Sequence, residues 1–141
     1  MILAGDIGGT KTNLALYEWT SERVEPVRLE SFHSGDYTSL EDILVEFLTP
    51  PQPPRSVESL ETESRNKGEQ AERQPPERVT LAAACFGIAG PIIDNRCQTT
   101  NLPWIVDGRV IAKQFEIPRV QLLNDLESTA YGVLWLRSDE L

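Results

Sequence analysis

The stretch that decides the fold of this chain is GDIGGTKTNL, residues 5–14. One apolar run, residues 1–4, precedes it, and a second apolar run, residues 14–17, follows. This order predicts a strand, a glycine-rich turn and a second strand. The adjacent glycines Gly8 and Gly9 allow φ values closed to other residues and let the backbone approach a ligand closely.

A turn of this kind can bind a phosphate group. Several backbone N–H groups could point at the anion, and Thr10 and Lys11 would add a hydroxyl group and a positive charge. Asp6, at the end of the first strand, is placed to interact with a metal ion, directly or through water. A hairpin turn without a ligand fits the pattern equally well, because Gly-Gly is common between paired strands.

Length and composition limit the class of protein. The chain has 141 residues, of which 40% are hydrophobic, which suits one domain with a core. Its formal net charge of −9 argues against broad nucleic-acid binding, because phosphates would be repelled. A nucleotide stays compatible, since local N–H groups and a bound cation can outweigh the overall field. No signal peptide or membrane-spanning run is visible, so we do not expect a membrane as partner. The negative charge likewise leads us to expect no nucleic acid as partner.

The two cysteines have no metal-ligand spacing. Cys85 lies within an apolar run and is expected to be a buried thiol, with Cys97 in a nearby loop. A disulfide is left open as an alternative, but a reduced, cytoplasmic protein is the simpler interpretation.

The first half of the chain predicts strands followed by a helix. Residues 2–6, 12–19 and 27–33 have strand patterns and short connections, which favours antiparallel pairing. Ser39, with Asp42 three residues later, resembles a capping box that begins a helix. The apolar stripe of this helix comprises Ile43, Leu44, Phe47 and Leu48, and it ends before Pro50 and Pro51.

Residues 50–77 differ in composition from the rest of the chain. They hold six of the ten prolines, mixed acidic and basic side chains, and only Val57, Leu60 and Ala71 as aliphatic residues. Such a segment cannot bury enough apolar area to offset its ordering entropy. We therefore expect a disordered Pro/Glu/Arg-rich insert in a surface loop, with a docking segment for a partner as the alternative.

The second half of the chain alternates strands and helices. Residues 79–91 form a continuous apolar run that is typical of a strand covered on both faces, as in a parallel sheet. Asp107 can cap a helix that ends at Pro118, and its predicted stripe comprises Val110, Ile111 and Phe115. Residues 120–123 predict a further buried strand, and a last helix is expected from about 126 to 136.

The resulting order is β-β-β-α-insert-β-α-β-α. A meander followed by βαβ crossovers predicts an α/β fold, a mixed five-stranded sheet with helices on its faces. In such sheets ligands gather at the carboxyl ends of the strands. Three candidate sites fall at such ends: the turn after Asp6, residues 87–91, and the pair Asn124-Asp125.

The pair Asn124-Asp125 has two interpretations. An Asp at a strand end can accept a proton from a substrate hydroxyl, which phosphoryl transfer requires, while the neighbouring Asn orients that hydroxyl. Alternatively the pair caps the helix that begins at Leu126, and without other motifs capping is favoured. Glu127 is expected to be a helix N-terminal charge.

Asn101 and Trp104 also have two interpretations. They could frame a polar, ring-shaped ligand, but Asn-Leu-Pro is also ordinary turn chemistry.

Four motifs together resemble a known family. They are GDIGGT (5–10), CFGIAGP (85–91), TNLPW (100–104) and LND (123–125), and they occur in the order seen in bacterial glucokinases. The chain resembles the cyanobacterial-type glucokinases most, which are members of the hexokinase/actin-like ATPase superfamily with its ribonuclease H-like halves. The resemblance covers the chain apart from residues 50–77.

The resemblance implies an ATP-dependent glucokinase. Asn124 would bind a glucose hydroxyl, and Asp125 would be the base that activates the 6-hydroxyl of the sugar. Asn101 and Trp104 would lie in the loop beside the sugar, and Mg²⁺ would accompany ATP near Asp6. The first phosphate loop for ATP would comprise Gly5, Asp6, Ile7, Gly8, Gly9 and Thr10, with Lys11 beside it.

Two departures from the family pattern bear on function. Residues 126–128 are Leu-Glu-Ser where the family usually has an aromatic or small residue, and the chain ends before the second, larger lobe. We therefore expect an N-terminal lobe, residues 1–49 and 78–141, that alone turns over slowly or not at all. A non-catalytic remnant or sugar-binding module, a kinase for another hexose, and a homodimer are left open.

Overall fold

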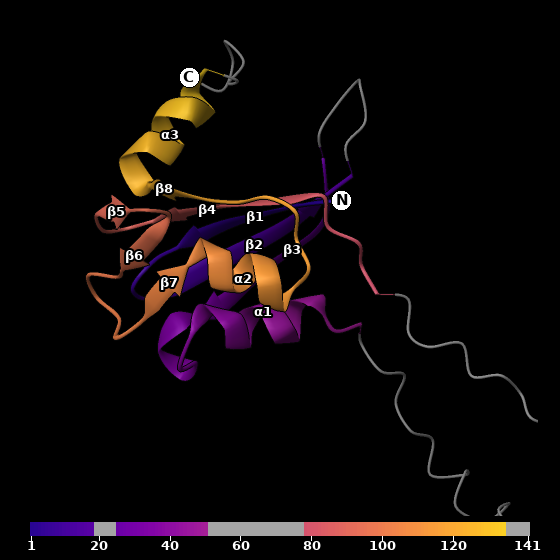
Figure 1. The fold of residues 1–141 in the computed structure, drawn as a ribbon, viewed down its shortest axis with the longest axis horizontal. Helices are drawn as coiled ribbons and strands as arrows, with labels where there is room; N and C mark the ends of the chain where they lie inside the picture. The colour runs from indigo at the N-terminus through magenta and orange to yellow at the C-terminus, as the bar shows by residue number, and fades with distance from the viewer. Residues whose placement is uncertain (19–24, 51–77, 135–141) are drawn as a thin grey trace, which may run out of the picture.

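The computed structural model describes residues 1–18, 25–50 and 78–134, which form an α/β fold around a five-stranded sheet in the order β3-β2-β1-β4-β8 (Figure 1). Antiparallel pairs join β1 to β2 and β2 to β3, and parallel pairs join β1 to β4 and β4 to β8. The predicted mixed sheet is therefore confirmed. Its strands are β1 (Ile2–Ile7), β2 (Lys11–Tyr17), β3 (Pro26–His33), β4 (Ala83–Ile88) and β8 (Val120–Asn124).

A small three-stranded antiparallel sheet, β5-β6-β7, lies at one end of the large sheet, where the sequence predicted only a loop (Figure 1). Its strands, β5 (Ile92–Ile93), β6 (Arg96–Gln98) and β7 (Ile105–Asp107), have two or three residues each. Strands this short show no readable alternation of apolar and polar residues. The hairpin between β5 and β6 turns at Asp94 and Asn95, whose φ angles of 52° and 58° are those of a type I′ turn.

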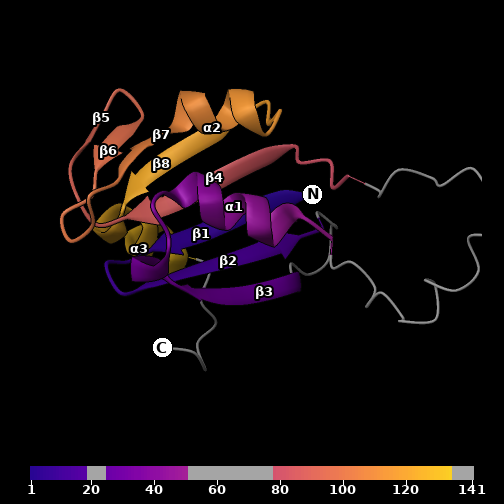
Figure 2. The ribbon, with the colours of Figure 1, turned by 90° about the horizontal axis from the view of Figure 1, so that it is seen from below.

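The helices cover the two faces of the large sheet unequally. Figure 1 shows α1 (Leu40–Leu48) and α2 (Gly108–Gln114) on one face and α3 (Asp125–Val133) on the other. Viewed from below, in Figure 2, α1 and α2 lie in front of the strands. A short 3₁₀ helix, η1 (Ser34–Asp36), links β3 to α1.

Burial follows the same division. The hydrophobic core lies between the large sheet and the helices α1 and α2, with Leu3, Leu14, Phe86 and Leu122 at 1% exposed or less. No residue of α3 is buried, although α3 contacts β4 and β8. A Cβ on Gly87 of β4 would lie 2.9 Å from the Ser128 hydroxyl oxygen of α3, so α3 rests closely on the sheet without a core of its own.

The helix α1 begins and ends where the sequence predicts. The Ser39 hydroxyl accepts a hydrogen bond from the Asp42 backbone amide at 3.2 Å, and Thr49 caps the other end just before Pro50. Three members of the predicted stripe are buried, together with Leu40, and Leu48 is half-buried.

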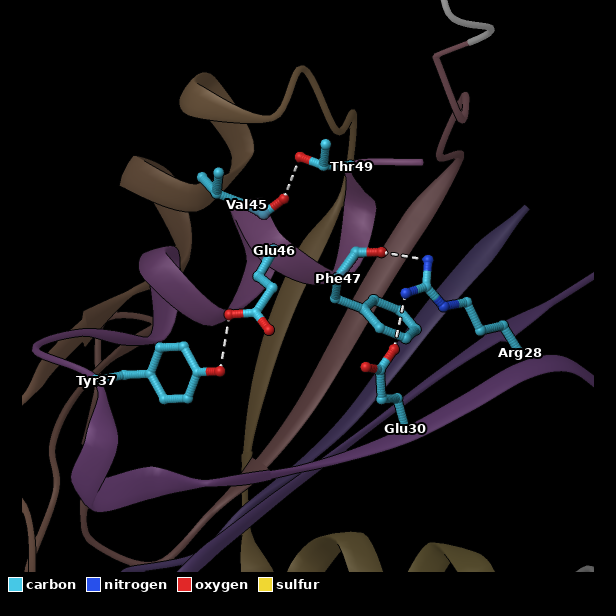
Figure 3. Close-up of polar contacts among 7 residues, drawn as sticks. All are labelled: Arg28, Glu30, Tyr37, Val45, Glu46, Phe47 and Thr49. Carbon is cyan, nitrogen blue, oxygen red and sulfur yellow. Dashed lines mark hydrogen bonds and ion pairs between the residues drawn. The ribbon is translucent and has the colours of Figure 1, made fainter. Parts of the chain in front are cut away.

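Arg28 ties the end of α1 to the edge strand β3 (Figure 3). Its guanidinium lies 4.5 Å from the centre of the Phe47 ring and donates to the Phe47 carbonyl at 2.6 Å. A second nitrogen forms an ion pair with Glu30 at 2.7 Å. The same figure shows Tyr37 donating to the Glu46 carboxylate at 2.7 Å, which fixes the chain before α1 to the helix itself.

Two predictions about side-chain burial were wrong. Val110 belongs to the predicted stripe of α2 but is 50% exposed, because α2 has only seven residues and buries one side, at Ile111. Cys97 lies in strand β6 and is the more buried cysteine, whereas Cys85 is half-buried. Both are free thiols, and burial raises the pKa of each.

Several predictions fall on other parts of the chain. The predicted disordered insert, residues 50–77, lies outside the described residues except for Pro50, and so does the expected end of the last helix at 136. Within the described ranges, no helix combines the length and the apolar character needed to cross a membrane.

Candidate functional site

The parallel register brings three strand ends together. Ile7 at the end of β1 pairs with Ile88 at the end of β4, and Ile88 pairs with Asn124 at the end of β8. Neighbouring strands lie about 4.8 Å apart, so the first and third strand ends are separated by about 10 Å across the sheet. The glycine-rich turn that follows β1 and the pair Asn124-Asp125 therefore lie at the same edge, the left end of the sheet in Figure 2.

The glycine-rich turn is a tight hairpin. The Gly8 amide donates to the Lys11 carbonyl at 3.0 Å. Gly90 is the only glycine with a positive φ among the described residues, so neither Gly8 nor Gly9 uses the left-handed φ values that glycine allows. Space is the reason for both glycines: a Cβ on Gly8 would lie 2.8 Å from the Lys11 carbonyl oxygen, and one on Gly9 would lie 2.6 Å from the Asn101 Cβ.

The seven candidate residues of the turn divide into two groups. Gly5 lies against the Phe86 ring, 2.5 Å from where its Cβ would stand, and Ile7 is 2% exposed, so both face the core. The other five are exposed or half-buried at the sheet edge: Asp6, Gly8, Gly9, Thr10 and Lys11. Within the described part of the chain, no hydrogen bond occupies the amides of Gly9 and Thr10.

Asn124 and Asp125 begin the helix α3. The Asn124 side chain is the N-cap, and it accepts from the Leu126 amide at 3.0 Å. Glu127 completes a capping box by accepting from the Asn124 amide at 3.1 Å, a more specific role than the helix-dipole charge expected of it. Asp125 also accepts from the Leu126 amide, at 2.9 Å, through one carboxylate oxygen.

Capping leaves some hydrogen-bonding groups of Asn124 and Asp125 available. The Asn124 side-chain oxygen accepts the two capping bonds, and its nitrogen donates one proton to the Gly90 carbonyl at 2.9 Å, which leaves one side-chain N–H for a ligand. Asp125 is exposed, and its second carboxylate oxygen makes no hydrogen bond within the described residues. The capping interpretation and the ligand interpretation are therefore compatible.

The loop after β4 joins the two halves of the site. At its start, Gly90 has φ 145° and receives the Asn124 side chain. The Thr100 hydroxyl donates to the Ala89 carbonyl at 3.1 Å, which closes the loop on itself. Exposed Asn101, the next residue, packs against Gly9 of the turn.

Trp104 has a different environment from Asn101. It is 2% exposed and belongs to the core cluster, and its indole N–H donates to the Tyr37 carbonyl at 3.3 Å. The Thr99 hydroxyl bonds the carbonyls of Leu102 and Trp104, at 2.8 and 3.2 Å. Burial argues against direct contact between Trp104 and a ligand and makes it an anchor of the Asn101 loop.

Sequence reasoning gave no role to three residues that support the site. Thr12 and Ser34 are buried polar side chains behind the turn, and Asn95 joins the small sheet to β8. The Asp-Asn pair at 94 and 95 is a hairpin signal that could have located Asn95. Ser34 lies far from the turn in sequence, so no local pattern points to it.

Comparison with known proteins decides the family. The family model "Glucokinase" matches residues 3–141, nearly the whole chain. The chain belongs to the glucokinase family. This membership confirms the family that the four sequence motifs predict.

Two curated glucokinases illustrate how the chain relates to its family. The Nostoc punctiforme glucokinase is 34% identical over 142 residues, which span 100% of this chain and 34% of that protein. The Synechocystis glucokinase is 35% identical over 144 residues, which span 99% of this chain and 35% of that protein. The chain therefore spans about a third of the length of the curated glucokinases it matches.

The fold agrees with the family. A solved glucokinase from an Antarctic psychrotroph superposes with a TM-score of 0.69 at 23% identity, covering 98% of this chain and 36% of that one. This likeness shows that the chain has the fold of the matching third of that glucokinase.

Proposed function

We propose that this chain is the N-terminal lobe of a glucokinase, which transfers a phosphoryl group from ATP to the 6-hydroxyl of glucose. The observation that carries the proposal is the register Ile7–Ile88–Asn124. It brings a turn with unoccupied amides and an exposed carboxylate to one edge of the sheet. Strand ends of this kind are where α/β sheets bind ligands.

The phosphate groups of ATP are assigned to the turn. The amides of Gly9 and Thr10 have no acceptor within the described residues, and exposed Lys11 adds a positive charge. Donors fixed in this way stabilise phosphoryl oxygens without reorganising at the moment of reaction.

Asp6 suits the Mg²⁺ that accompanies ATP. Its exposed carboxylate stands at the end of β1, between Asn13 and Gly87 in the register. Mg²⁺ is typically held by one or two carboxylates together with phosphates and waters. No group of three His, Cys, Asp or Glu side chains able to hold a metal occurs among the described residues, and this mode needs none. When bound, Mg²⁺ neutralises charge on the phosphates.

The sugar is assigned to Asn124, Asp125 and Asn101. Asn124 keeps one side-chain N–H with which to orient a hydroxyl group. Asp125 would accept the proton of the 6-hydroxyl through its free oxygen as the new O–P bond forms. Asn101 extends from the loop that contacts Gly9, so it would stand between the sugar and the phosphates. Trp104 would hold this loop from the core.

The chain by itself is expected to turn over slowly or not at all. It spans about a third of its relatives, and phosphoryl transfer depends on positioning and on exclusion of water. We include a cytoplasmic location in the proposal because both cysteines are free thiols. A homodimer is left open.

A chimera tests the assignment of Asp125. Residues 1–141 replace the matching third of the Nostoc punctiforme glucokinase, and glucose phosphorylation is measured. We expect Asp125→Asn to lower kcat at least about 100-fold, the effect of losing a general base. The Asn side chain keeps an acceptor for the Leu126 amide, so stability should change little.

The control for this test is Asp94→Asn, the same change at an exposed aspartate of the β5–β6 turn. It should leave kcat unchanged. Full activity of the Asp125→Asn chimera would reassign Asp125 to helix capping alone.

A second candidate is a non-catalytic sugar-binding module of the same fold. Calorimetry of the 141-residue chain with glucose and with Mg·ATP separates the two. Binding of glucose, combined with a chimera that is folded but inactive, would favour the module. The same calorimetry with other hexoses tests the remaining alternative, a different sugar.

A further inference from the structure

Ser34 stands directly behind the phosphate turn. It is the first residue of η1, immediately after β3, and its side chain is 0% exposed. Its hydroxyl donates to the Gly8 carbonyl at 2.8 Å, and its backbone amide donates to the Thr10 carbonyl at 2.9 Å. One residue therefore holds two carbonyl groups of the turn.

The direction of the hydrogen bonds around Ser34 is fixed by counting protons. The Ser34 hydroxyl has one proton, and a carbonyl can only accept, so that proton points to Gly8. The Thr12 hydroxyl, 2.9 Å from the Ser34 hydroxyl and also 0% exposed, must then be the donor of the pair. The result is a buried chain from Thr12 through Ser34 to the Gly8 carbonyl, in which each bond strengthens the next.

This series of hydrogen bonds determines where the Gly9 amide points. The Gly8 carbonyl and the Gly9 N–H belong to one peptide plane, and in a trans peptide they point in opposite directions. No cis peptide bond occurs in the described residues. Because Ser34 draws the Gly8 oxygen toward the protein interior, the Gly9 N–H is turned away from Ser34.

We propose that Ser34 is a positioning residue of the phosphate turn, which presents the Gly9 amide to a phosphate group and withdraws the Gly8 and Thr10 carbonyl oxygens from it. Without this clamp the Gly8–Gly9 peptide is free to flip, because neither glycine has a side chain to prevent it. A flipped peptide presents a carbonyl oxygen to the anion in place of an N–H. This role rests on the proposed binding of ATP phosphates at the turn.

The test uses the ¹⁵N-labelled 141-residue chain titrated with Mg·ATP, observed by NMR at the Gly9 and Thr10 amides. In the unsubstituted chain both amide signals should shift on titration. We expect Ser34→Ala to weaken the apparent affinity about five- to tenfold, the effect of about one lost hydrogen bond. In Ser34→Ala without ligand, ¹⁵N relaxation should give the Gly9 amide an order parameter below about 0.6.

Ser31→Ala is the matched control. Ser31 lies in β3, three residues before Ser34, and its exposed hydroxyl donates to the Asn13 side chain at 2.7 Å. This variant removes a serine hydroxyl bond between β3 and β2 without touching the turn. Its affinity and its Gly9 relaxation should match those of the unsubstituted chain.

Thr12→Val is a second variant in case Ser34→Ala does not fold. It keeps the bond from Ser34 to Gly8 and removes only the donor behind it, so its affinity should fall by less than about threefold. A fall of about fivefold or more in the affinity of Thr12→Val would contradict the proposed bond order.

The outcomes separate this inference from the proposed function. If the unsubstituted chain shows no shift at Gly9 and Thr10, the assignment of phosphate to the turn is wrong. If that chain binds, and Ser34→Ala binds equally well with a rigid Gly9 amide, only the role of Ser34 is wrong.

Discussion

Asn95 pairs with Leu122 as a neighbouring strand would. The Asn95 side-chain oxygen accepts from the Leu122 backbone amide at 2.8 Å, and its side-chain nitrogen donates to the Val120 carbonyl at 2.7 Å. A single side chain thus occupies part of the open edge of β8 and fixes the β5–β6 hairpin to it. Gly108 permits this approach, since a Cβ there would lie 2.2 Å from the Asn95 nitrogen.

Replacement of Asn95 tests this contact. Asn95→Ala removes both hydrogen bonds and places alanine at a φ of 58°, whereas Asn95→Gly removes the bonds without that strain. We expect about 1–3 kcal/mol lower unfolding free energy for glycine, and a further loss of about 1 kcal/mol for alanine. Urea unfolding measures both losses. Hydrogen exchange should show that the Leu122 amide is unprotected in both variants. Unchanged protection at Leu122 would refute the pairing.

Glu116 offers a stabilising change. It follows α2 with φ 54°, the left-handed conformation in which helices commonly end with glycine. Its carboxylate also lies near the negative end of the helix dipole. We expect Glu116→Gly to raise the unfolding free energy by about 1 kcal/mol, measured by urea unfolding.

Glu116→Ala serves as the control for that change. It removes the charge but keeps the backbone strain, so it should raise the unfolding free energy by no more than about 0.5 kcal/mol. Equal gains from both substitutions would assign the effect to charge alone.

Alanine substitutions at Gly87 and Gly132 test how closely α3 rests on the sheet. A Cβ on Gly87 would lie 2.9 Å from the Ser128 hydroxyl oxygen and 3.0 Å from the Ser128 Cβ, so α3 must move in Gly87→Ala. We expect a loss of about 1–3 kcal/mol in thermal unfolding. A Cβ on Gly132 would meet no atom of the described residues within 4 Å, and Gly132→Ala should gain about 0.5–1 kcal/mol from helix propensity. The reverse order of stabilities would contradict the packing of α3.

Tyr37 gives a pH-dependent prediction. The hydrogen bond to Glu46 raises the pKa of the Tyr37 phenol, with smaller contributions from burial and nearby carboxylates. Because the folded state holds this proton more tightly, the stabilisation is complete below about pH 10 and is lost as pH rises through the raised pKa.

The measurement is an absorbance titration of phenolate at 295 nm. Subtracting the curve of Tyr37→Phe isolates the Tyr37 phenol from the other tyrosines. We expect Glu46→Gln to shift the Tyr37 titration to lower pH, because the carboxylate acceptor is gone. An identical Tyr37 titration in both proteins would show that the hydrogen bond is not formed in solution.

The large sheet and α1 could be predicted from sequence because each element carries a local signal. Ser39 is followed by Asp42 and an apolar stripe, and residues 79–91 form a single apolar run. The small sheet could not be predicted, since strands of two or three residues are stabilised by contacts across the fold. Val110 was misassigned because the sequence does not show how few turns α2 has.

In the candidate site, too, residues with a local sequence signal were predictable and those held by distant contacts were not. The residues of its strand ends were predictable because the motifs are contiguous, as in the turn and the pair Asn124-Asp125. Their supporting contacts were not, since Ser34 meets Gly8 only through the pairing of β2 with β3. Trp104 likewise packs in the core with residues distant in sequence, and its indole N–H donates to the Tyr37 carbonyl.

The position of β1 in the sheet has a consequence for synthesis on the ribosome. Ile2 pairs on one side with Tyr17, which emerges soon after it, and on the other side with Ala83, which emerges much later. A nascent chain therefore exposes an unpaired edge of its central strand until β4 has emerged, a state that invites aggregation or chaperone binding. Asn124 arrives later still, so translation that stops before this residue yields a chain lacking one half of the ligand-binding edge.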